Sequence, residues 1–460
     1  MMTTFSIPYP LLQAILAEMQ RRPYHLAVGA AGVSQSRRGD TEILARSFRL
    51  VHEGALRDPQ NAPTPQFELG YVPFTLDRPD VWQAIAFAAR VEDDLPAAPT
   101  CSLMLGSGRD LGLFTGIFRE RDQIAPVEVM NVVGAGMHRL GAVDFPPYPH
   151  SEQAPADRER WGRLIGALGG PEVWQRLTAL SFCIVGVGRT GSLVAATLAR
   201  QGIRSLTLID PDRLEMHNLD AMDAVTESDL GRFKAEALRD NLQRDLPHVA
   251  IRALPQSALT AAARDLIKSA DILIGCVDDD AARLALGGLA CCYAKPYLDL
   301  GTGVFSEVLH LAATQTIGHR QLGADVRLIL PGDGCLLCWG GVQNAPTALQ
   351  RWRSGTGRRS WNEERAGSLR SLNALAAHSG LRLIEDMVSG HLRQSVWFRH
   401  ETDAHGIPSL RRLSGHPRPG CPLCAVLGAG DLLARPAAGT DPVRHLSAPP
   451  LARTLPSGTP

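Results

Sequence analysis

The chain has 460 residues, with Lys+Arg and Asp+Glu at 47 each; 45% of its residues are hydrophobic and 20% are charged. This length predicts two or three domains, and the composition is typical of a soluble globular protein with a buried core. The balanced charge argues against nucleic acid or an anionic membrane as a partner. No apolar run reaches the roughly 18 residues that span a bilayer. Because the N-terminus also lacks a basic segment and a small-residue cleavage site, we expect a cytoplasmic protein.

The first part of the chain predicts an α/β domain over residues 1–143. Residues 1–20 predict a short helix, and a second helix is expected at Val81–Arg90. Strands are expected in YHLAVGAAGV, EILARSFRLV, TCSLMLG, LGLFTGIFRE and VEVMNVVG. The prolines of residues 144–156 then mark a linker between domains.

A second α/β domain is expected over residues 157–427. It starts with the arginine-rich helix ADRERWGRLIGAL and continues through the strands FCIVG, SLTLID, VAIRALP, ADILIGCVD and KPYLDLG. Helical stretches separate these strands, which is typical of a parallel sheet. Residues 428–460 are rich in Ala, Pro, Gly and Leu without periodicity, so we expect a disordered tail.

A glycine-rich turn follows the strand FCIVG. Gly186, Gly188 and Gly191 let the backbone turn tightly and approach a phosphate at the start of the next helix. Asp210 ends the following strand, where its carboxylate can accept hydrogen bonds from ribose hydroxyls. This pattern predicts a nucleotide site, and an NAD-binding Rossmann fold is its generic interpretation.

Four of the nine cysteines form two CxxC pairs, Cys335–Cys338 and Cys421–Cys424. Two such pairs can complete a closed tetrahedral zinc site, which would be structural because no coordination position stays open. A redox CxxC is the competing interpretation. The remaining cysteines lie in apolar segments and predict buried packing; they are Cys101, Cys183, Cys276, Cys291 and Cys292.

Lysine occurs only at positions 234, 268 and 295, so nearly all positive charge is arginine. A GC-rich genome explains this bias. Avoidance of self-modification, in a system that conjugates to lysine amines, is the alternative.

With these motifs in order, residues 157–427 resemble the ThiF/MoeB/HesA superfamily, the adenylating domains of ubiquitin-activating enzymes and their bacterial relatives. The resemblance implies a Rossmann-like domain with a mainly parallel sheet, ATP and Mg²⁺ as cofactors, and a structural Zn²⁺. It assigns nucleotide contacts to the glycine turn, to Asp210 and to Asn218 of the N-L segment. It assigns the phosphate-binding lysine to Lys234 and the magnesium-binding aspartate to Asp278, with Arg283 following.

The resemblance also implies a homodimer, because relatives keep an arginine in the first helix that reaches the ATP of the opposite subunit. Arg158, Arg160 and Arg163 are the candidates, and we assign the role to Arg160 and Arg163. The reaction would activate the C-terminal glycine of a ubiquitin-like or sulfur-carrier protein. Its carboxylate is already ionised, so positioning and charge neutralisation by Lys234, an arginine and Mg²⁺ would suffice. A conjugating enzyme is a further expected partner, and antiviral defence is an expected context by analogy.

Two departures from the family pattern affect activity. Ala221 occupies the arginine position of the N-L-x-R segment, and Arg189 or Arg213 are candidates to compensate. The segment Trp339–Glu364, where many relatives carry a thioester-forming cysteine, contains none. We therefore expect the reaction to stop at the adenylate. A catalytically impaired nucleotide-binding scaffold is the alternative, while an NAD-linked oxidoreductase would leave Lys234 and the paired CxxC without a role.

The first domain resembles the JAB-type deubiquitinase domains that bacteria fuse to such adenylating modules. Active JAB domains bind zinc through an H-x-H motif, and none occurs in residues 1–150. We therefore expect a degenerate JAB-like domain that binds a ubiquitin-like protein or another partner.

Overall fold

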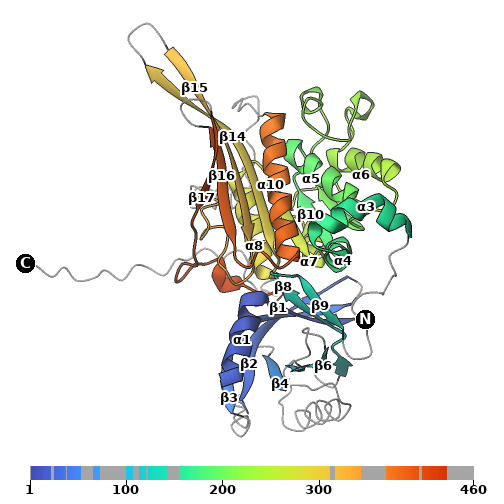
Figure 1. Ribbon diagram of the computed structural model, residues 1–460, viewed down its shortest axis with the longest axis vertical. Helices are drawn as coiled ribbons and strands as arrows, with labels where there is room; N and C mark the ends of the chain where they lie inside the picture. Colours follow the sequence, from blue (N-terminus) through green and yellow to red (C-terminus); the bar gives the residue numbers. More distant parts are fainter. Residues whose placement is uncertain are drawn as a thin grey trace, which may run out of the picture.

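The computed structural model describes residues 2–21, 25–37, 39–52, 66–72, 100–106, 113–120, 123–141, 155–310, 316–342, 369–402 and 407–431. Within these ranges the chain forms two β-sheets, one from residues 3–141 and one from residues 181–413 (Figure 1). None of the helices that it describes is long and apolar enough to cross a membrane.

The first sheet has nine strands in the order β7-β6-β5-β4-β2-β3-β1-β8-β9. One long helix, α1 (Tyr9–Arg21), packs against it through Leu12, Ile15 and Met19. The strands are β1 (Thr3–Pro8), β2 (His25–Gln35), β3 (Thr41–His52), β4 (Gln66–Val72), β5 (Thr100–Gly106), β6 (Leu113–Glu120), β7 (Gln123–Pro126), β8 (Val129–Val133) and β9 (His138–Gly141). The predicted strands over β2, β3, β5, β6 and β8 are confirmed.

The expected helix over residues 1–20 is wrong for its first part. Residues 3–8 form β1, which pairs in parallel with β3 on one side and β8 on the other. Phe5 and Ile7 are completely buried there, so this burial in the sheet centre outweighs a continued helix. Pro10 falls in the first turn of α1, where a missing N–H costs nothing. The helix predicted at Val81–Arg90 lies outside the described residues.

The second sheet has eight strands in the order β12-β11-β10-β13-β14-β15-β16-β17. Its first five strands run parallel, as predicted, and the strand order reverses between β10 and β13. Ligands bind at such a reversal in open α/β sheets. The strands are β10 (Ser181–Val185), β11 (Ser205–Ile209), β12 (Ala250–Leu254), β13 (Ile272–Gly275), β14 (Tyr297–His310), β15 (Thr316–Ile329), β16 (Val396–Thr402) and β17 (Pro408–Leu413).

The mainly parallel sheet that we predicted is in fact mixed. β14 extends well beyond KPYLDLG and pairs with β15 in a long antiparallel hairpin, which projects from the sheet in Figure 1. β16 and β17 continue the antiparallel half. These strands carry many polar residues, so they lack the continuous apolar runs that reveal a buried parallel strand.

Helices cover both faces of the parallel half. Each face has its own hydrophobic core, and successive residues of β10 point alternately into the two cores. Phe182 and Ile184 belong to the first core, and Cys183 and Val185 belong to the second. The first core is completed by α3 (Pro155–Leu168), α4 (Pro171–Ala179), α5 (Arg189–Arg200), α6 (Lys234–Asp245) and α10 (Arg370–Val388). The second is completed by α7 (Ala261–Ser269) and α8 (Asp280–Cys292). The helix α3 begins at Pro155, inside the expected linker.

Residues 427–431, here called the C-terminal strap, join the two sheets. They follow the second CxxC pair, and Gly430 forms a parallel bridge with Val33 of β2. Arg46 of β3 donates from Nε to the carbonyl oxygen of Leu427, at 2.9 Å. Asp431 accepts from the backbone N–H of Gln35 at 2.8 Å and from the hydroxyl of Tyr293 at 2.9 Å. We expected residues 428–460 to be disordered. For residues 428–431 this expectation is wrong, because they pack against both sheets.

Asp431→Ala is expected to lower the free energy of unfolding by about 2–3 kcal/mol, because it removes three hydrogen-bonding partners at once. Among them, the Lys268 ammonium lies 3.0 Å from the Asp431 carboxylate. Asp265→Ala is the matched control: Asp265 lies farther from the same Lys268 Nζ, at 3.6 Å, and its other partner is the exposed Arg37, at 2.6 Å. It should cost less than ~1 kcal/mol. If urea denaturation gave the same decrease in the free energy of unfolding for both variants, the contacts of the C-terminal strap would not stabilise the protein.

Candidate functional site

The three glycines of the turn after β10 have different structural roles. Gly186 has φ +83°, and a Cβ there would lie 2.7 Å from the carbonyl oxygen of Cys276. At Gly191 a Cβ would lie 2.0 Å from the carbonyl oxygen of Gly186, so the helix packs directly on the turn. Gly188 is the N-cap of α5, with no side-chain cap and open space around it. The first N–H groups of α5 are therefore available to an anion.

Asp210 lies at the end of β11 and fixes the same turn. Its carboxylate accepts from the N–H of Val187 and from the N–H of Asp212, both at 2.9 Å. Burial raises the pKa of Asp210, while the Lys234 charge and these two hydrogen bonds oppose that rise. The carboxylate is thus held at the edge where the predicted ribose would lie.

Lys234 begins α6 and lies beside Asp210. Its Nζ is 3.4 Å from the Asp212 carboxylate, and its backbone N–H donates to the carbonyl oxygen of Asp212 at 2.8 Å. The side chain is only 12% exposed. The fold therefore brings Lys234 to the same edge of the sheet as Asp210, and its contact with phosphate stays a prediction.

Asp278 and Asp279 follow β13 and differ in what they contact. Asp279 is the N-cap of α8, and its carboxylate accepts from the N–H of Ala282 at 2.9 Å. Asp278 is exposed, and among the described residues no hydrogen bond or ion pair engages its carboxylate. Because β13 adjoins β10 at the reversal of strand order, Asp278 is a free carboxylate next to the glycine turn.

Asn218 has a structural role in this fold. Its Oδ1 accepts from the N–H of Glu215 at 3.0 Å, which closes the short helical turn η3 (Met216–Asn218). Arg189, the first residue of α5, binds the same turn through the carbonyl oxygen of His217 at 2.7 Å and through the Asp220 carboxylate at 2.8 Å. A contact of Asn218 with nucleotide stays a prediction.

Ala221, which stands at the position of the missing arginine in the N-L-x-R segment, is completely buried. Arg370, at the start of α10, donates to the carbonyl oxygen of Ala221 at 2.7 Å and pairs with Asp223. Arg213 makes different contacts. Its guanidinium stacks over the Phe233 ring at 4.0 Å and donates to the carbonyl oxygen of Gly231 at 2.6 Å. Of the two candidates for compensation, Arg189 is the one at the glycine turn.

Arg160 and Arg163 of α3 are not brought to the glycine turn. Trp161 of α3 donates from its indole to the carbonyl oxygen of Arg200 at 2.9 Å, and Trp174 of α4 donates to that of Gln201 at 3.2 Å. Both bonds cap the far end of α5, about 18 Å along the helix from Gly188. Arg160 and Arg163 are exposed near that end, and the side chain of Arg158 lies outside the described residues.

A buried ion-pair network beside the pocket was missed by sequence reasoning. Asp299 of β14 is 0% exposed and lies 3.0 Å from Arg327 of β15, which is 2% exposed. Arg327 also donates to the carbonyl oxygens of Trp339 and Gly340, directly after the first CxxC pair. Arg283 approaches the other side of Asp299 at 3.5 Å. A charged residue inside the apolar strand KPYLDLG was the available signal.

Arg327→Met is expected to destabilise the fold by about 3–5 kcal/mol, because it leaves the Asp299 carboxylate buried without its main partner. The double variant Arg327→Met/Asp299→Leu should recover part of that loss, since it removes both charges of the pair but leaves Arg283 without the Asp299 carboxylate. Urea denaturation of both variants checks this. A single-variant cost below ~1 kcal/mol would show that the pair is not desolvated.

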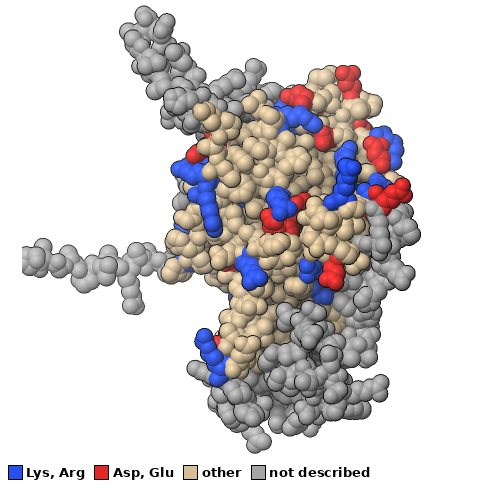
Figure 2. Space-filling model, viewed as in Figure 1, with Lys and Arg blue, Asp and Glu red and all other residues tan. Residues whose placement is uncertain are grey.

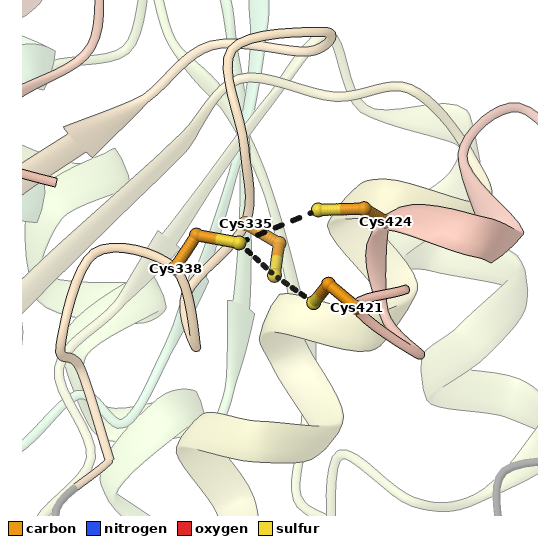
Figure 3. A group of neighbouring side chains, drawn as sticks. All are labelled: Cys335, Cys338, Cys421 and Cys424. Atoms are coloured by element: carbon orange, nitrogen blue, oxygen red, sulfur yellow. Dashed lines mark hydrogen bonds between the residues drawn. The ribbon is translucent and has the colours of Figure 1, made fainter. Parts of the chain in front are cut away.

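The four CxxC cysteines meet as predicted, in what is here called the four-cysteine cluster (Figure 3). Their sulfur atoms lie within 4.8 Å of one another, with Cys335 and Cys421 3.4 Å apart and Cys338 and Cys424 3.6 Å apart. Four sulfurs bound to one zinc at ~2.3 Å would lie about 3.8 Å apart, which this cluster fits. Cys335, Cys338 and Cys421 are buried, so four uncompensated thiolates there would be costly. The cluster can hold one structural Zn²⁺.

The other cysteines largely follow their predicted role. Cys101, Cys183, Cys291 and Cys292 are buried, and Cys276 is half-buried beside the glycine turn. Burial raises the pKa of the Cys101, Cys183 and Cys276 thiols.

Residues 162–355 match the ThiF family. The chain is 33% identical over 124 residues to the molybdopterin-synthase adenylyltransferase of Escherichia coli (strain K12), an alignment that covers 27% of this chain and 49% of that protein. It is 31% identical over 139 residues to the ATP-dependent ubiquitin transferase-like protein Cap2 of Enterobacter hormaechei, covering 29% of this chain and 22% of that protein. The chain thus spans half or less of the length of these curated relatives.

A crystal structure of E. coli MccB with MccA-N7isoASN shares 18% sequence identity with the chain at a TM-score of 0.45, covering 60% of this chain and 76% of that one. The sulfur carrier protein adenylyltransferase of Thermus thermophilus is 26% identical over 162 residues, covering 35% of this chain and 59% of that protein. Residues 162–355, the segment that matches the ThiF family, contain the glycine turn, Asp210, Lys234 and Asp278.

Proposed function

We propose that this chain uses ATP to adenylate the C-terminal glycine of a ubiquitin-like or sulfur-carrier protein. The observation that carries the proposal is the convergence of the open N-terminus of α5, Asp210, Lys234 and Asp278 at the reversal of strand order. The adenylyltransferases among the sequence relatives support it.

Each group has a chemical role in this reaction. The N–H groups of α5 would hold phosphate oxygens, and Asp210 would accept from the ribose. Lys234 would neutralise charge that develops during attack on the α-phosphate. Asp278 would hold Mg²⁺, which supplies further charge neutralisation when bound. The four-cysteine cluster would hold a Zn²⁺ that stabilises the fold.

The position of α3 supports a homodimer. Arg160 and Arg163 lie far from the glycine turn of their own chain, so they would act on the site of a second copy. The first sheet, as a degenerate JAB-like domain, would bind the ubiquitin-like protein or a conjugating enzyme. A bacterial conjugation or sulfur-transfer pathway, including antiviral defence, is the proposed setting.

ATP–pyrophosphate exchange tests the activity, with a panel of glycine-terminated ubiquitin-like and sulfur-carrier proteins that includes any encoded beside this gene. We expect exchange with one of them. The second candidate function is a nucleotide-binding scaffold, which the buried Ala221 favours because one phosphate clamp is absent. Retained ATP binding without exchange across the panel would reject the enzyme and favour the scaffold.

A further inference from the structure

The three lysines of the chain share one environment. Lys234, Lys268 and Lys295 are the only lysines in 460 residues, and all three lie in the described part of the structure. Their side chains are 12%, 9% and 8% exposed, respectively. Of the 47 Lys and Arg residues, 44 are therefore arginine; Figure 2 draws both types in blue and shows them spread over the visible face. Guanidinium groups stay protonated and are poor nucleophiles.

Each lysine is also paired with a carboxylate. The Nζ atoms lie 3.4 Å from Asp212 for Lys234, 3.0 Å from Asp431 for Lys268, and 3.3 Å from Glu42 for Lys295. Lys268 and Lys295 thereby bind the strap and the first sheet, respectively. Low exposure and an ion pair thus both restrict access of a reagent to these three amines.

The thiols are sequestered in a similar way. Of the nine cysteines, seven are buried and two, Cys276 and Cys424, are half-buried. Cys424 belongs to the four-cysteine cluster. Cys276 packs under the glycine turn, where its Cβ lies 3.5 Å from the position that a Cβ at Gly191 would take. All nine positions are described, so the count covers the entire chain.

We propose that the chain is inert toward the acyl-adenylate formed at its own site, so that the acyl group passes to an amine or thiol of another molecule. This inference rests on the proposed function and deepens it. In the transfer, the bond between the acyl carbon and the phosphate oxygen breaks and a C–N or C–S bond forms. AMP leaves with the electron pair of the broken bond, and the attacking group releases its proton to solvent.

The first test probes the amines without nucleotide or partner protein. N-hydroxysuccinimidyl acetate acylates accessible amines by the same type of displacement. In the full native chain we expect Lys268 and Lys295 to react at least about 100-fold more slowly than in urea. Peptide mass spectrometry measures both rates. Rates at Lys268 or Lys295 within ~3-fold of the urea rates would overturn the proposal. This outcome is independent of whether the chain adenylates anything.

The second test uses a matched variant. Met216 of η3 is 64% exposed and precedes His217, which Arg189 of the glycine turn binds, so Met216→Lys adds one accessible amine near the proposed site. With ATP, Mg²⁺ and the partner that supports exchange, we expect an acyl adduct on the variant at position 216 and none on the lysines and cysteines of the native chain. An ATP-dependent adduct on any native lysine or cysteine would contradict the inference. Absence of exchange with every panel member would instead reject the proposed function, while the first test still decides the inertness of the amines.

Discussion

Asp278→Ala is expected to reduce ATP–pyrophosphate exchange by on the order of 10³-fold, while Asp279→Ala keeps exchange within about 3-fold of the native rate. The two aspartates are adjacent, yet only Asp279 bonds to a backbone N–H, that of Ala282. Asp278 keeps a free, exposed carboxylate beside the glycine turn. Its removal takes away the proposed magnesium ligand without removing a cap, so activity should fall while the fold persists.

The control variant should show the opposite pattern. Asp279→Ala removes the N-cap of α8 and is expected to cost about 1 kcal/mol of stability. Steady-state exchange measured against Mg²⁺ concentration, together with urea denaturation, separates the two effects. If Asp278→Ala catalysed exchange at the native rate, Asp278 would not be part of the site. If only Asp279→Ala lost exchange, Asp279 would be the magnesium ligand in place of Asp278.

Lys234→Ala complements this test from the other side of the pocket. Lys234 lies beside Asp212, and its charge opposes the rise that burial causes in the pKa of Asp210. Its removal is expected to weaken ATP binding and to slow exchange by about 10²–10³-fold. Isothermal titration calorimetry measures the ATP affinity of the variant, and the pyrophosphate exchange assay measures its rate. Unchanged ATP affinity together with unchanged exchange would exclude Lys234 from the phosphate site.

The sequence predicted the parallel half of the second sheet because each strand there is buried on both faces. A strand such as Ser181–Val185 then reads as an uninterrupted apolar run, and the turn that follows it needs glycine for steric reasons. Asp210, Lys234 and Asp278 could be placed because each follows a strand or starts a helix at one edge of that sheet. At this edge of the sheet, the position of a residue after a strand or at the start of a helix is enough to place it near the glycine turn.

What the sequence did not reveal depends on pairing between distant segments. The Asp299–Arg327 contact joins residues 28 positions apart, and the bond from Arg46 to Leu427 joins residues 381 positions apart. Asp299 stands out as a charge within an apolar strand, but nothing local in the sequence identifies the partner in either contact. Residues 3–8 became a strand only because β3 and β8 flank them, and residues 428–431 became ordered only because two sheets enclose them. Such elements are fixed by tertiary contacts that override local propensity.

Cys335→Ser is expected to abolish zinc binding and to destabilise the protein strongly, because structural zinc sites contribute about 10–16 kcal/mol in small domains while whole proteins are stable by only about 5–15 kcal/mol. The native chain should contain one zinc ion, measured by elemental analysis. Cys101→Ala is the matched control, a buried thiol of the first sheet that is not part of the cluster. It should retain the zinc and lose about 1 kcal/mol.

The same variant tests how far the cluster's influence extends. Arg46 of β3 bonds to the carbonyl oxygens of Ala425 and Leu427, immediately after Cys424, and Asp431 bonds to the N–H of Gln35. Loss of zinc should therefore increase hydrogen exchange in residues 421–431 and at Gln35, whereas β10 and β11 stay protected within their own core. If exchange increased only in the two CxxC segments, the strap would be held by the first sheet alone. Zinc would then stabilise the CxxC segments and have no effect on the junction between the two sheets.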